Sequence, residues 1–179
     1  MKLKELFEAK AERSILSVMG KQEDQYPGYF YCAGNKLTSL QGAPQVVNDS
    51  FYCAHNNLTS LEGAPSAVKG NFSCSNNKLT SLEGAPSVVK GDFSCFYNNL
   101  TSLAGIHKII KEIHGCADFE KNPIKSSVLG LMRIKGLTKV YLDNKQVEDI
   151  LNKYLEGDRD IIKCQSELLD AGLEEYAKL

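Results

Sequence analysis

The chain has 179 residues, of which 42% are hydrophobic and 24% are charged, so it can bury the core of an ordinary globular protein. Its 21 basic and 22 acidic side chains leave a net charge of -1, which gives no field that favours nucleic acid or an anionic membrane as a partner. No segment reaches the apolar length of a membrane span, and the charged first residues lack the pattern of a secretion signal. We therefore expect a cytoplasmic protein with neither nucleic-acid nor membrane partners.

Residues 1–24 predict an amphipathic helix, because their apolar side chains recur at intervals of three and four and Gly20 follows as a helix-ending residue. The apolar positions are Leu3, Leu6, Phe7, Ala11, Ile15, Val18 and Met19. The repeats that follow leave an apolar end when they stack, so we expect this segment to be an N-terminal capping helix. A helix that lies on a membrane surface or binds a partner is the alternative.

Residues 25–127 repeat one sequence unit with a period of 21 residues. Five cysteines mark the period: Cys32, Cys53, Cys74, Cys95 and Cys116. Around each of the first four, phenylalanine stands two residues before, asparagine three residues after, and leucine five and eight residues after. The asparagines are Asn35, Asn56, Asn77 and Asn98. A valine position also repeats with the same period, and we expect it to be occupied by Tyr26, Val47, Val68, Val89 and Ile110.

A fixed period of this length indicates a solenoid, because one repeat cannot bury its own apolar face and only stacking closes the core. Phenylalanine and cysteine two residues apart lie on the same face of a short strand, which we expect to pair in parallel with its copies. The asparagine amide both donates and accepts hydrogen bonds, so a column of asparagines can satisfy backbone groups that no strand reaches. Gly-Ala-Pro, at 42–44, 63–65 and 84–86, reverses the chain without a helix.

The unit Phe-x-Cys-x-x-Asn-x-Leu-Thr-Ser-Leu resembles the leucine-rich repeat, with phenylalanine and cysteine in two of the leucine places, over about residues 26–125. The tail "CQSELLDAGLEEYAKL" is similar to the helical ending of small repeat proteins of tailed bacteriophages. The resemblance implies an α/β leucine-rich-repeat solenoid with an N-terminal capping helix and a helical C-terminal cap. It also implies a phage-encoded protein that binds a host protein, with an anti-defence role as one form of that interaction.

The repeats decay towards residue 127. After Cys116, the places of asparagine and the first leucine hold Phe119 and Lys121. Residues 128–179 are expected to form a helical C-terminal capping region. Within it, residues 139–143 predict a last strand, Asn144 caps a helix through Leu155, and Asp158 caps another helix through Asp170.

The sequence offers little evidence of catalysis. Six cysteines without a C-x-x-C pair or a cysteine–histidine cluster favour a buried column of small apolar side chains over a metal stripe or a redox function. The three histidines occupy unlike repeat positions and none lies beside a nucleophile, while the acidic cluster at residues 156–160 suits a helix N-terminus better than magnesium. We expect no catalytic residue, metal or cofactor, and an enzyme of unrecognised type is the third choice.

The positions beside each cysteine point outward on the strand and differ from repeat to repeat. Aromatic and imidazole side chains gather there, and we predict that they bind a protein partner on a concave strand face: Tyr31, Tyr52, His55, Phe96 and Tyr97. Drift on a tolerant surface, or cover for the N-terminal junction by the first two tyrosines, explains the same residues without binding. The rival function is self-association as a homodimer or virion component, so both monomer and homodimer remain open.

Overall fold

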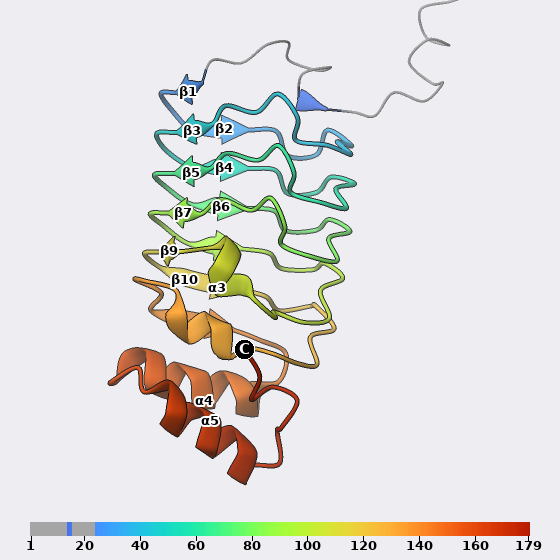
Figure 1. Cartoon of the computed structure of the whole chain (residues 1–179). Helices are drawn as coiled ribbons and strands as arrows, with labels where there is room; N and C mark the ends of the chain where they lie inside the picture. Colours follow the sequence, from blue (N-terminus) through green and yellow to red (C-terminus); the bar gives the residue numbers. More distant parts are fainter. Residues whose placement is uncertain (1–13, 16–23) are drawn as a thin grey trace, which may run out of the picture.

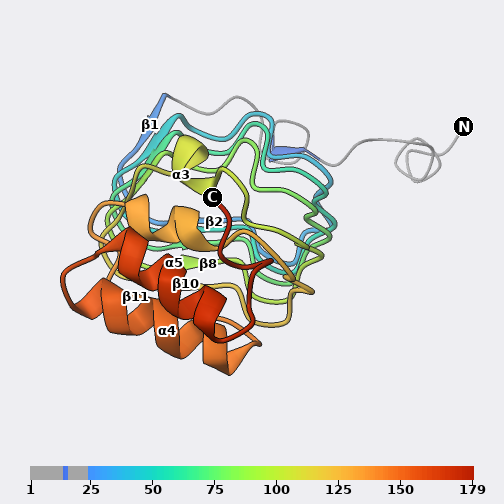
Figure 2. The same cartoon turned by 60° about the horizontal axis from the view of Figure 1, so that its bottom comes forward.

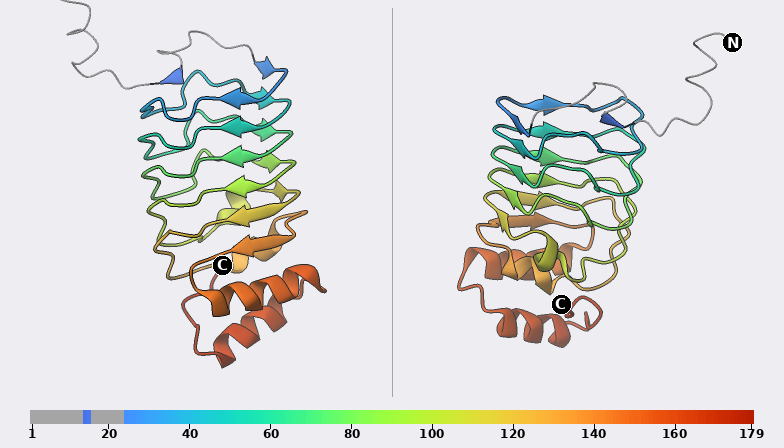
Figure 3. Two further views of the ribbon diagram at one scale, coloured as in Figure 1. Left: turned by 180° about the vertical axis from the view of Figure 1, so that it is seen from behind. Right: turned by 45° about the horizontal axis from the view of Figure 1, so that its top comes forward.

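The computed structural model describes residues 14, 15 and 24–179, which form a parallel β-solenoid with coils stacked one above another (Figure 1). Two sheets run along the stack. The five-stranded sheet contains β1 (Gln25–Tyr26), β3 (Val46–Val47), β5 (Ala67–Val68), β7 (Val88–Val89) and β9 (Glu112–Ile113), in that order. The six-stranded sheet contains β2 (Phe30–Tyr31), β4 (Phe51–Tyr52), β6 (Phe72–Ser73), β8 (Phe93–Ser94), β10 (Cys116–Asp118) and β11 (Lys139–Tyr141) (Figure 3).

Strand pairing follows the sequence period through the first four coils. Phe30 pairs with Phe51, and the same step of 21 residues leads on to Phe72 and Phe93. The phenylalanine rings stack with centroids 5.3, 5.7 and 5.4 Å apart, which matches the spacing of neighbouring strands. The predicted repeat solenoid with short parallel strands is therefore confirmed.

The core lies between the two sheets and the leucine turns. Phenylalanine, cysteine, leucine and valine of successive coils are buried in columns, as in the coil with Phe72, Cys74, Leu79 and Val89, all 0% exposed. Each coil alone is too thin to enclose these side chains, so their burial depends on the neighbouring coils.

The period changes once, between β8 and β10. Val89 pairs with Ile113 and Phe93 pairs with Ala117, which are steps of 24 residues instead of 21. The short helix α3 (Ile106–Ile109) lies in this coil where earlier coils have Gly-Ala-Pro, and it accounts for the longer path. Ile113, not Ile110, therefore continues the valine column.

The same insertion removes Cys116 from the cysteine column. Cys116 is only partly buried, and the position in register with Cys95 is taken by Phe119. The ring of Phe119 lies 5.9 Å from that of Phe93, so it fills the space that the small side chain of Ala117 leaves in the phenylalanine column. The expectation that Phe119 occupies an asparagine place is wrong for the same reason, since that place belongs to Asn122.

A column of asparagine side chains joins the coils at the turns that follow the six-stranded sheet. In Asn77, Oδ1 accepts from the backbone N–H of Leu58 at 3.0 Å, and Nδ2 donates to the carbonyls of Cys53 and Cys74 at 3.1 and 3.0 Å. Asn56, Asn98 and Asn122 make equivalent bonds. The side chain of Asn35 is exposed and donates within its own coil to Ala33, so among the described residues it joins no two coils.

A second column of polar side chains, which the sequence analysis did not anticipate, joins the coils where these strands begin. Ser50 Oγ accepts from the N–H of Asn71 at 3.0 Å, Asn71 Oδ1 from that of Asp92 at 2.9 Å, and Asp92 Oδ1 from that of Cys116 at 2.8 Å. A Cβ atom at Gly91 would lie 2.1 Å from Asn71 Oδ1. The recurring glycine before the strand is therefore required by this close contact.

The chain continues from residue 128 through the 3₁₀ helix η1 (Leu129–Arg133), β11, α4 (Lys145–Glu156) and α5 (Ile161–Asp170), with α4 and α5 at the end of the stack (Figure 2). Asn144 is the N-cap of α4, as predicted, and accepts from the N–H of Val147 at 3.2 Å. The cap of α5 is Asp160 instead of the predicted Asp158, because the chain turns through Arg159 in the left-handed region, with φ 56°, before the helix begins.

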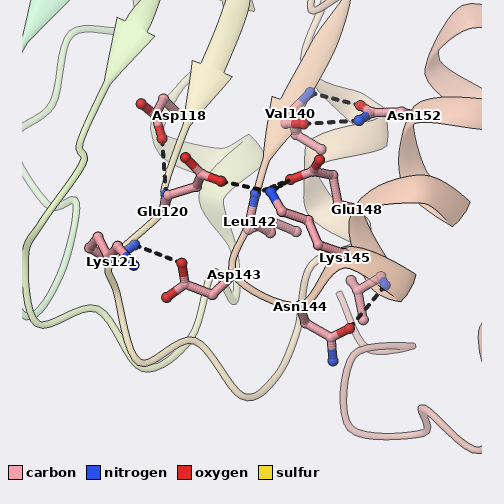
Figure 4. A network of polar contacts seen from close by, with 11 residues as sticks. Asp118, Glu120, Lys121, Val140, Leu142, Asp143, Asn144, Lys145, Glu148 and Asn152 are labelled. Carbon is pink, nitrogen blue, oxygen red and sulfur yellow. Dashed lines mark hydrogen bonds and ion pairs between the residues drawn. The ribbon is translucent and has the colours of Figure 1, made fainter.

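Side chains of α4 bond the outer edge of β11. Asn152 exchanges two hydrogen bonds with the backbone of Val140, at 2.8 and 2.9 Å, and Glu148 accepts from the N–H of Leu142 at 2.6 Å (Figure 4). A strand of another chain can pair with an exposed strand edge, and these hydrogen bonds block that pairing at β11.

The helix expected within residues 1–24 lies outside the described residues, apart from residues 14, 15 and 24. Ile15 is in helical conformation and is 1% exposed within the core. In the part of the chain that the structure describes, no helix is long and apolar enough to cross a membrane.

The asparagine column gives a matched pair of variants. We expect Asn77→Ala to lower the free energy of unfolding by about 3 kcal/mol, because buried N–H and C=O groups of two coils lose their partners. Asn35→Ala is expected to lower it by less than about 0.5 kcal/mol, since that side chain is exposed. Urea denaturation followed by circular dichroism measures both, and equal losses would contradict the role assigned to the column.

Candidate functional site

The outward side of the six-stranded sheet, here called the strand face, carries two columns of side chains. They flank the buried column that contains the cysteines. The first column consists of Tyr31, Tyr52, Ser73, Ser94, Asp118 and Tyr141, and the second of Ala33, Ala54, Ser75, Phe96, Glu120 and Asp143. Along the stack, the side chains of the strand face change from aromatic, through hydroxyl-bearing, to aromatic and acidic.

The structure groups the predicted partner-binding residues into two aromatic pairs. The rings of Tyr31 and Tyr52 lie 6.1 Å apart at one end of the strand face, and those of Phe96 and Tyr97 lie 6.1 Å apart nearer the other end. Tyr31 and Tyr97 are 65% and 59% exposed. The fifth predicted residue, His55, is exposed in the turn after β4.

Serine side chains separate the two aromatic pairs. Ser75 Oγ and Ser94 Oγ lie 2.7 Å apart, and Ser73 Oγ donates to Ser75 Oγ at 3.4 Å. These hydroxyls satisfy one another, so a partner can lie across them without leaving them unpaired. The serines were not among the predicted site residues, although they stand in columns that vary from repeat to repeat.

His55 and Tyr97 both have backbone conformations that few side chains adopt. The residue at this place of the turn is left-handed in five successive coils: Gly34, His55, Asn76, Tyr97 and Lys121, with φ between 55° and 72°. Glycine and asparagine suit this region and histidine is also enriched in it, whereas a tyrosine strains the backbone by about 1 kcal/mol. Tyr97 therefore has a cost in stability, which fits a role for its side chain on the surface.

Tyr97→Asn tests this cost. We expect the variant to have a free energy of unfolding that is about 0.5 to 1 kcal/mol higher than that of the wild type, because asparagine tolerates the left-handed backbone. Tyr52→Asn, on the strand itself, is expected to lower it by about 1 kcal/mol, since asparagine is a poor strand former. Urea denaturation of the two variants measures the contrast, and a clear loss in Tyr97→Asn would show that the tyrosine stabilises the fold.

Carboxylates gather at the last coils of the strand face (Figure 4). Asp118 accepts from the N–H of Glu120 at 3.0 Å, and Asp143 accepts from the N–H of Lys121 at 3.0 Å. Glu120 pairs with Lys145 at 2.6 Å. Within the described residues neither Asp118 nor Asp143 forms an ion pair.

The surroundings of Asp118 disfavour its charge. Burial raises the pKa of this carboxyl group, and the nearby carboxylates of Glu120 and Asp143 raise it further. The backbone N–H of Glu120 and the ammonium of Lys145 lower it, but by less. The neighbouring lysine is in the opposite situation, because its hydrogen bonds to Glu120 and then to Glu148 raise the pKa of Lys145. The fold therefore disfavours the charged form of Asp118 and favours that of Lys145.

Asp118→Asn keeps the acceptor for the N–H of Glu120 and removes the charge. A carboxyl group whose pKa is raised by folding costs stability above that pKa, so we expect the variant to melt about 2 °C higher at neutral pH. The difference should shrink as the pH falls through the raised pKa and disappear below 3.8, the ordinary value, because the carboxyl group is then protonated in both the folded and the unfolded wild type. Melting curves at several pH values measure it, and a lower melting temperature for the variant at neutral pH would contradict the assignment.

The five-stranded sheet presents a different charge pattern. Its outward positions carry Lys69, Lys90 and His114, and Lys135 lies beside them. Glu112 is held by Lys90 at 2.6 Å, His114 at 3.1 Å and Lys135 at 3.2 Å, and these bonds lower its pKa to about 2. The five-stranded sheet thus presents cations around one carboxylate, whereas the carboxylates at the last coils of the strand face stand beside Lys121, Lys139 and Lys145.

The cysteine column offers little reactivity. Burial raises the pKa of the Cys32 thiol to about 12 and also raises that of Cys53. Cys53 Sγ donates to the carbonyl of Ser73 at 3.3 Å. Since the thiolate is the reactive form, these side chains act as packed apolar groups.

The described histidines and acidic residues assemble no metal site. Among the described residues, no three histidine, cysteine, aspartate or glutamate side chains lie close enough together to hold a metal ion. Burial, followed by the charge of Arg133, lowers the pKa of His107. Asp158 and Asp160 are occupied at the start of α5, where both pair with Lys163, at 3.0 and 3.2 Å.

Two hollows lie away from the strand face. One of about 650 Å³ is lined by residues 135–138 together with Leu155, Glu156 and Arg159. The guanidinium of Arg159 donates to the carbonyls of Ile134 and Leu137, so its hydrogen-bonding groups are directed into the protein. The other, of about 290 Å³, lies beside the leucine turns of the third and fourth coils and α3. Neither hollow contains a residue predicted to bind a partner.

Comparisons of the chain with protein-family models, with curated proteins and with solved structures give no match. Its function is therefore inferred from its own residues.

The acidic residues of the strand face were missed because the period was read through Cys116. That reading puts Asp118 in the turn position of His55, whereas strand pairing puts it opposite Ser94. Alignment on Asn122 gives the register that the structure shows. The signal was present in the sequence, in an asparagine 24 residues after Asn98.

Proposed function

We propose that the chain is a non-enzymatic protein-binding module of the leucine-rich-repeat class, which binds its partner through a concave strand face. The exposed aromatic pairs carry this proposal. Tyrosine provides a large apolar surface with a polar tip, and it is enriched among the residues that dominate binding energy. Tyr31 and Tyr97 are largely exposed at the surface of a sheet whose core side chains are sealed inside.

The strained turn residue Tyr97 supports the same function. Gly34 and Asn76 suit the left-handed conformation, whereas Tyr97 strains it. A function of the Tyr97 ring on the surface would account for this cost. The raised pKa of the Cys32 thiol fits a cysteine column that packs inside the solenoid and leaves binding to the surface side chains.

The repeat unit supports assignment to the leucine-rich-repeat class, with the helix expected within residues 1–24 and the helices α4 and α5 acting as caps. α4 supports the C-terminal cap, because its side chains bond the open edge of β11. The resemblance of the tail to that of phage repeat proteins supports a phage-encoded protein that binds a host protein in the bacterial cytoplasm. A protein of host defence is then a natural target.

The test is quantitative affinity purification from bacterial lysate with the full chain as bait. We expect the double variant Tyr52→Ser/Tyr97→Asn to lose at least about tenfold of the partner retained by the wild type, as for residues that dominate an interface. Ile162→Ser is the matched control, because Ile162 is a 79% exposed apolar residue on α5, away from the strand face. It should retain the partner in full.

Three outcomes would contradict the proposal: retention of the same partner by the double variant, equal loss in the control, or no specific partner of the wild type. Light scattering on the purified chain addresses the rival. A dimer that the double variant dissociates would assign the strand face to self-association instead.

A further inference from the structure

We propose that the outer edge of β2 binds an extended segment of the partner protein, which adds to the six-stranded sheet as a further strand. This inference rests on the proposed function and names the way in which the backbone of the partner is bound. It follows from a difference between the outer edges of the two sheets, with β1 and β2 at one end of the stack and α4 and α5 at the other (Figure 1).

Both sheets are blocked at the end of the stack that α4 and α5 cover. Side chains of α4 bond the outer edge of β11. On the other sheet, the guanidinium of Arg159 donates to the carbonyls of Ile134 and Leu137. These carbonyls flank Lys135, whose backbone continues the five-stranded sheet beyond β9. A further strand therefore finds backbone groups at this end that side chains already occupy.

A proline blocks the edge of β1. In later coils, the N–H of the residue after this strand donates to the preceding coil, as Asn48 does to Tyr26 and Lys69 does to Val47, both at 2.9 Å. Pro27 holds this place in the first coil, 21 residues before Asn48, and has no N–H to donate. A proline on an outer strand disfavours pairing with another strand.

The edge of β2 has neither form of protection. The N–H groups of Phe30 and Cys32 donate to the coil of β4, at 2.7 and 2.8 Å. Alternate residues of a strand direct their backbone groups to opposite sides, so the N–H and C=O groups of Tyr31 point away from β4. Within residues 24–179 these two groups form no hydrogen bond, and Tyr31 is 65% exposed. The edge therefore offers a donor and an acceptor to an incoming backbone.

Asn35 continues this edge into the turn. In later coils the asparagine Oδ1 accepts from an N–H of the preceding coil, as Asn56 does from Leu37 at 2.9 Å. Among the described residues the side chain of Asn35 bonds only the carbonyl of Ala33, at 3.2 Å, so its Oδ1 is available to a donor. An N–H group of the added segment fits this acceptor.

An extended protein segment matches these groups better than other occupants do. Its backbone carries donors and acceptors at the spacing of a strand, which is how strand addition to a sheet edge gives affinity. The rings of Tyr29 and Tyr31, 63% and 65% exposed, provide apolar surface for its side chains. A second copy of this chain is a weaker occupant, because residues 1–23 are attached to the same end of each copy and would have to fit into one contact.

Hydrogen exchange in the free, full chain is the first test. We expect the protection of the Tyr31 N–H to be at least about a hundredfold lower than that of Cys32, which is bonded within the sheet. Equal protection of the two in dilute protein would show that the chain itself covers the edge, and would overturn the proposal. Protection of Tyr31 that appears only at high protein concentration would assign the edge to a second copy instead.

The second test uses a library of random peptides of about ten residues, the length of a long strand, selected on the immobilised full chain. We expect the enriched peptides to slow the exchange of the Tyr31 N–H. Methylation of the peptide nitrogen at alternate residues should weaken binding at least about tenfold, whereas methylation of the residues between them should have less effect. The reason is that only one side of an added strand is bonded to β2.

Two substitutions at one position separate the backbone from the ring. Tyr31→Pro removes the outward N–H and should weaken binding at least about tenfold. Tyr31→Thr is the matched control, because it also removes the ring but keeps the N–H and suits a strand, so it should weaken binding less. Asn35→Ala should weaken binding about fivefold, as for one hydrogen bond, with an unchanged melting curve. The methylation pattern needs no variant, so it tests the proposal even when Tyr31→Pro does not fold.

The outcomes distinguish this inference from the proposed function. Enriched peptides that depend on Tyr52 and Tyr97, but leave the exchange of Tyr31 unchanged, would overturn strand addition and leave the proposed function intact. Peptides that bind Tyr31→Pro and Tyr52→Ser/Tyr97→Asn as well as the wild type, or no enrichment at all, would overturn both.

Discussion

The asparagine column is the interaction on which this structure depends. Each turn that follows the six-stranded sheet buries backbone groups that strand pairing does not satisfy. One such group left unpaired costs about 1 to 3 kcal/mol, so several of them together would offset a large part of a domain's stability. Four asparagine side chains satisfy these groups, because each donates to carbonyls of two coils and accepts from the N–H of a leucine. They are Asn56, Asn77, Asn98 and Asn122. Because one amide bonds two coils, it fixes their register as well as their distance.

Register in turn decides what the molecule shows to its surroundings. In a strand a shift of one residue exchanges the inner and outer faces, so the in-register stack seals phenylalanine and cysteine inside and leaves their neighbours outside. The change from 21 to 24 residues at the fourth coil keeps Asn122 in the column and moves Asp118 and Glu120 onto the strand face. The same insertion places Phe119 in the core, where its ring fills the space that the small side chain of Ala117 leaves beside Phe93. Core packing and surface charge are thus set by one insertion.

The sequence was sufficient for the solenoid, its period and its parallel strands, because these follow from the spacing of phenylalanine, asparagine and leucine. It was insufficient where a residue type recurs by coincidence: Cys116 stands 21 residues after Cys95 and yet belongs to another column. The second polar column was missed because Ser50, Asn71 and Asp92 share no identity, only an acceptor atom at the same place. The aromatic residues of the strand face, and their division between its two ends, were predicted from the repeat and the alternation of the strand, whereas the distances between the rings depend on side-chain positions that no pattern encodes.

Hydrogen exchange of individual backbone amides tests the central claim most directly. The N–H groups of Leu58, Leu79 and Leu100 point to asparagine oxygens, at 3.0 Å in each case, and lie in turns that would otherwise open easily. The account predicts that they exchange as slowly as the amides of the central strands, since they are released only when the stack unfolds. Exchange as fast as that of the exposed turn amides would contradict it, because the asparagine column would then not hold the coils in register.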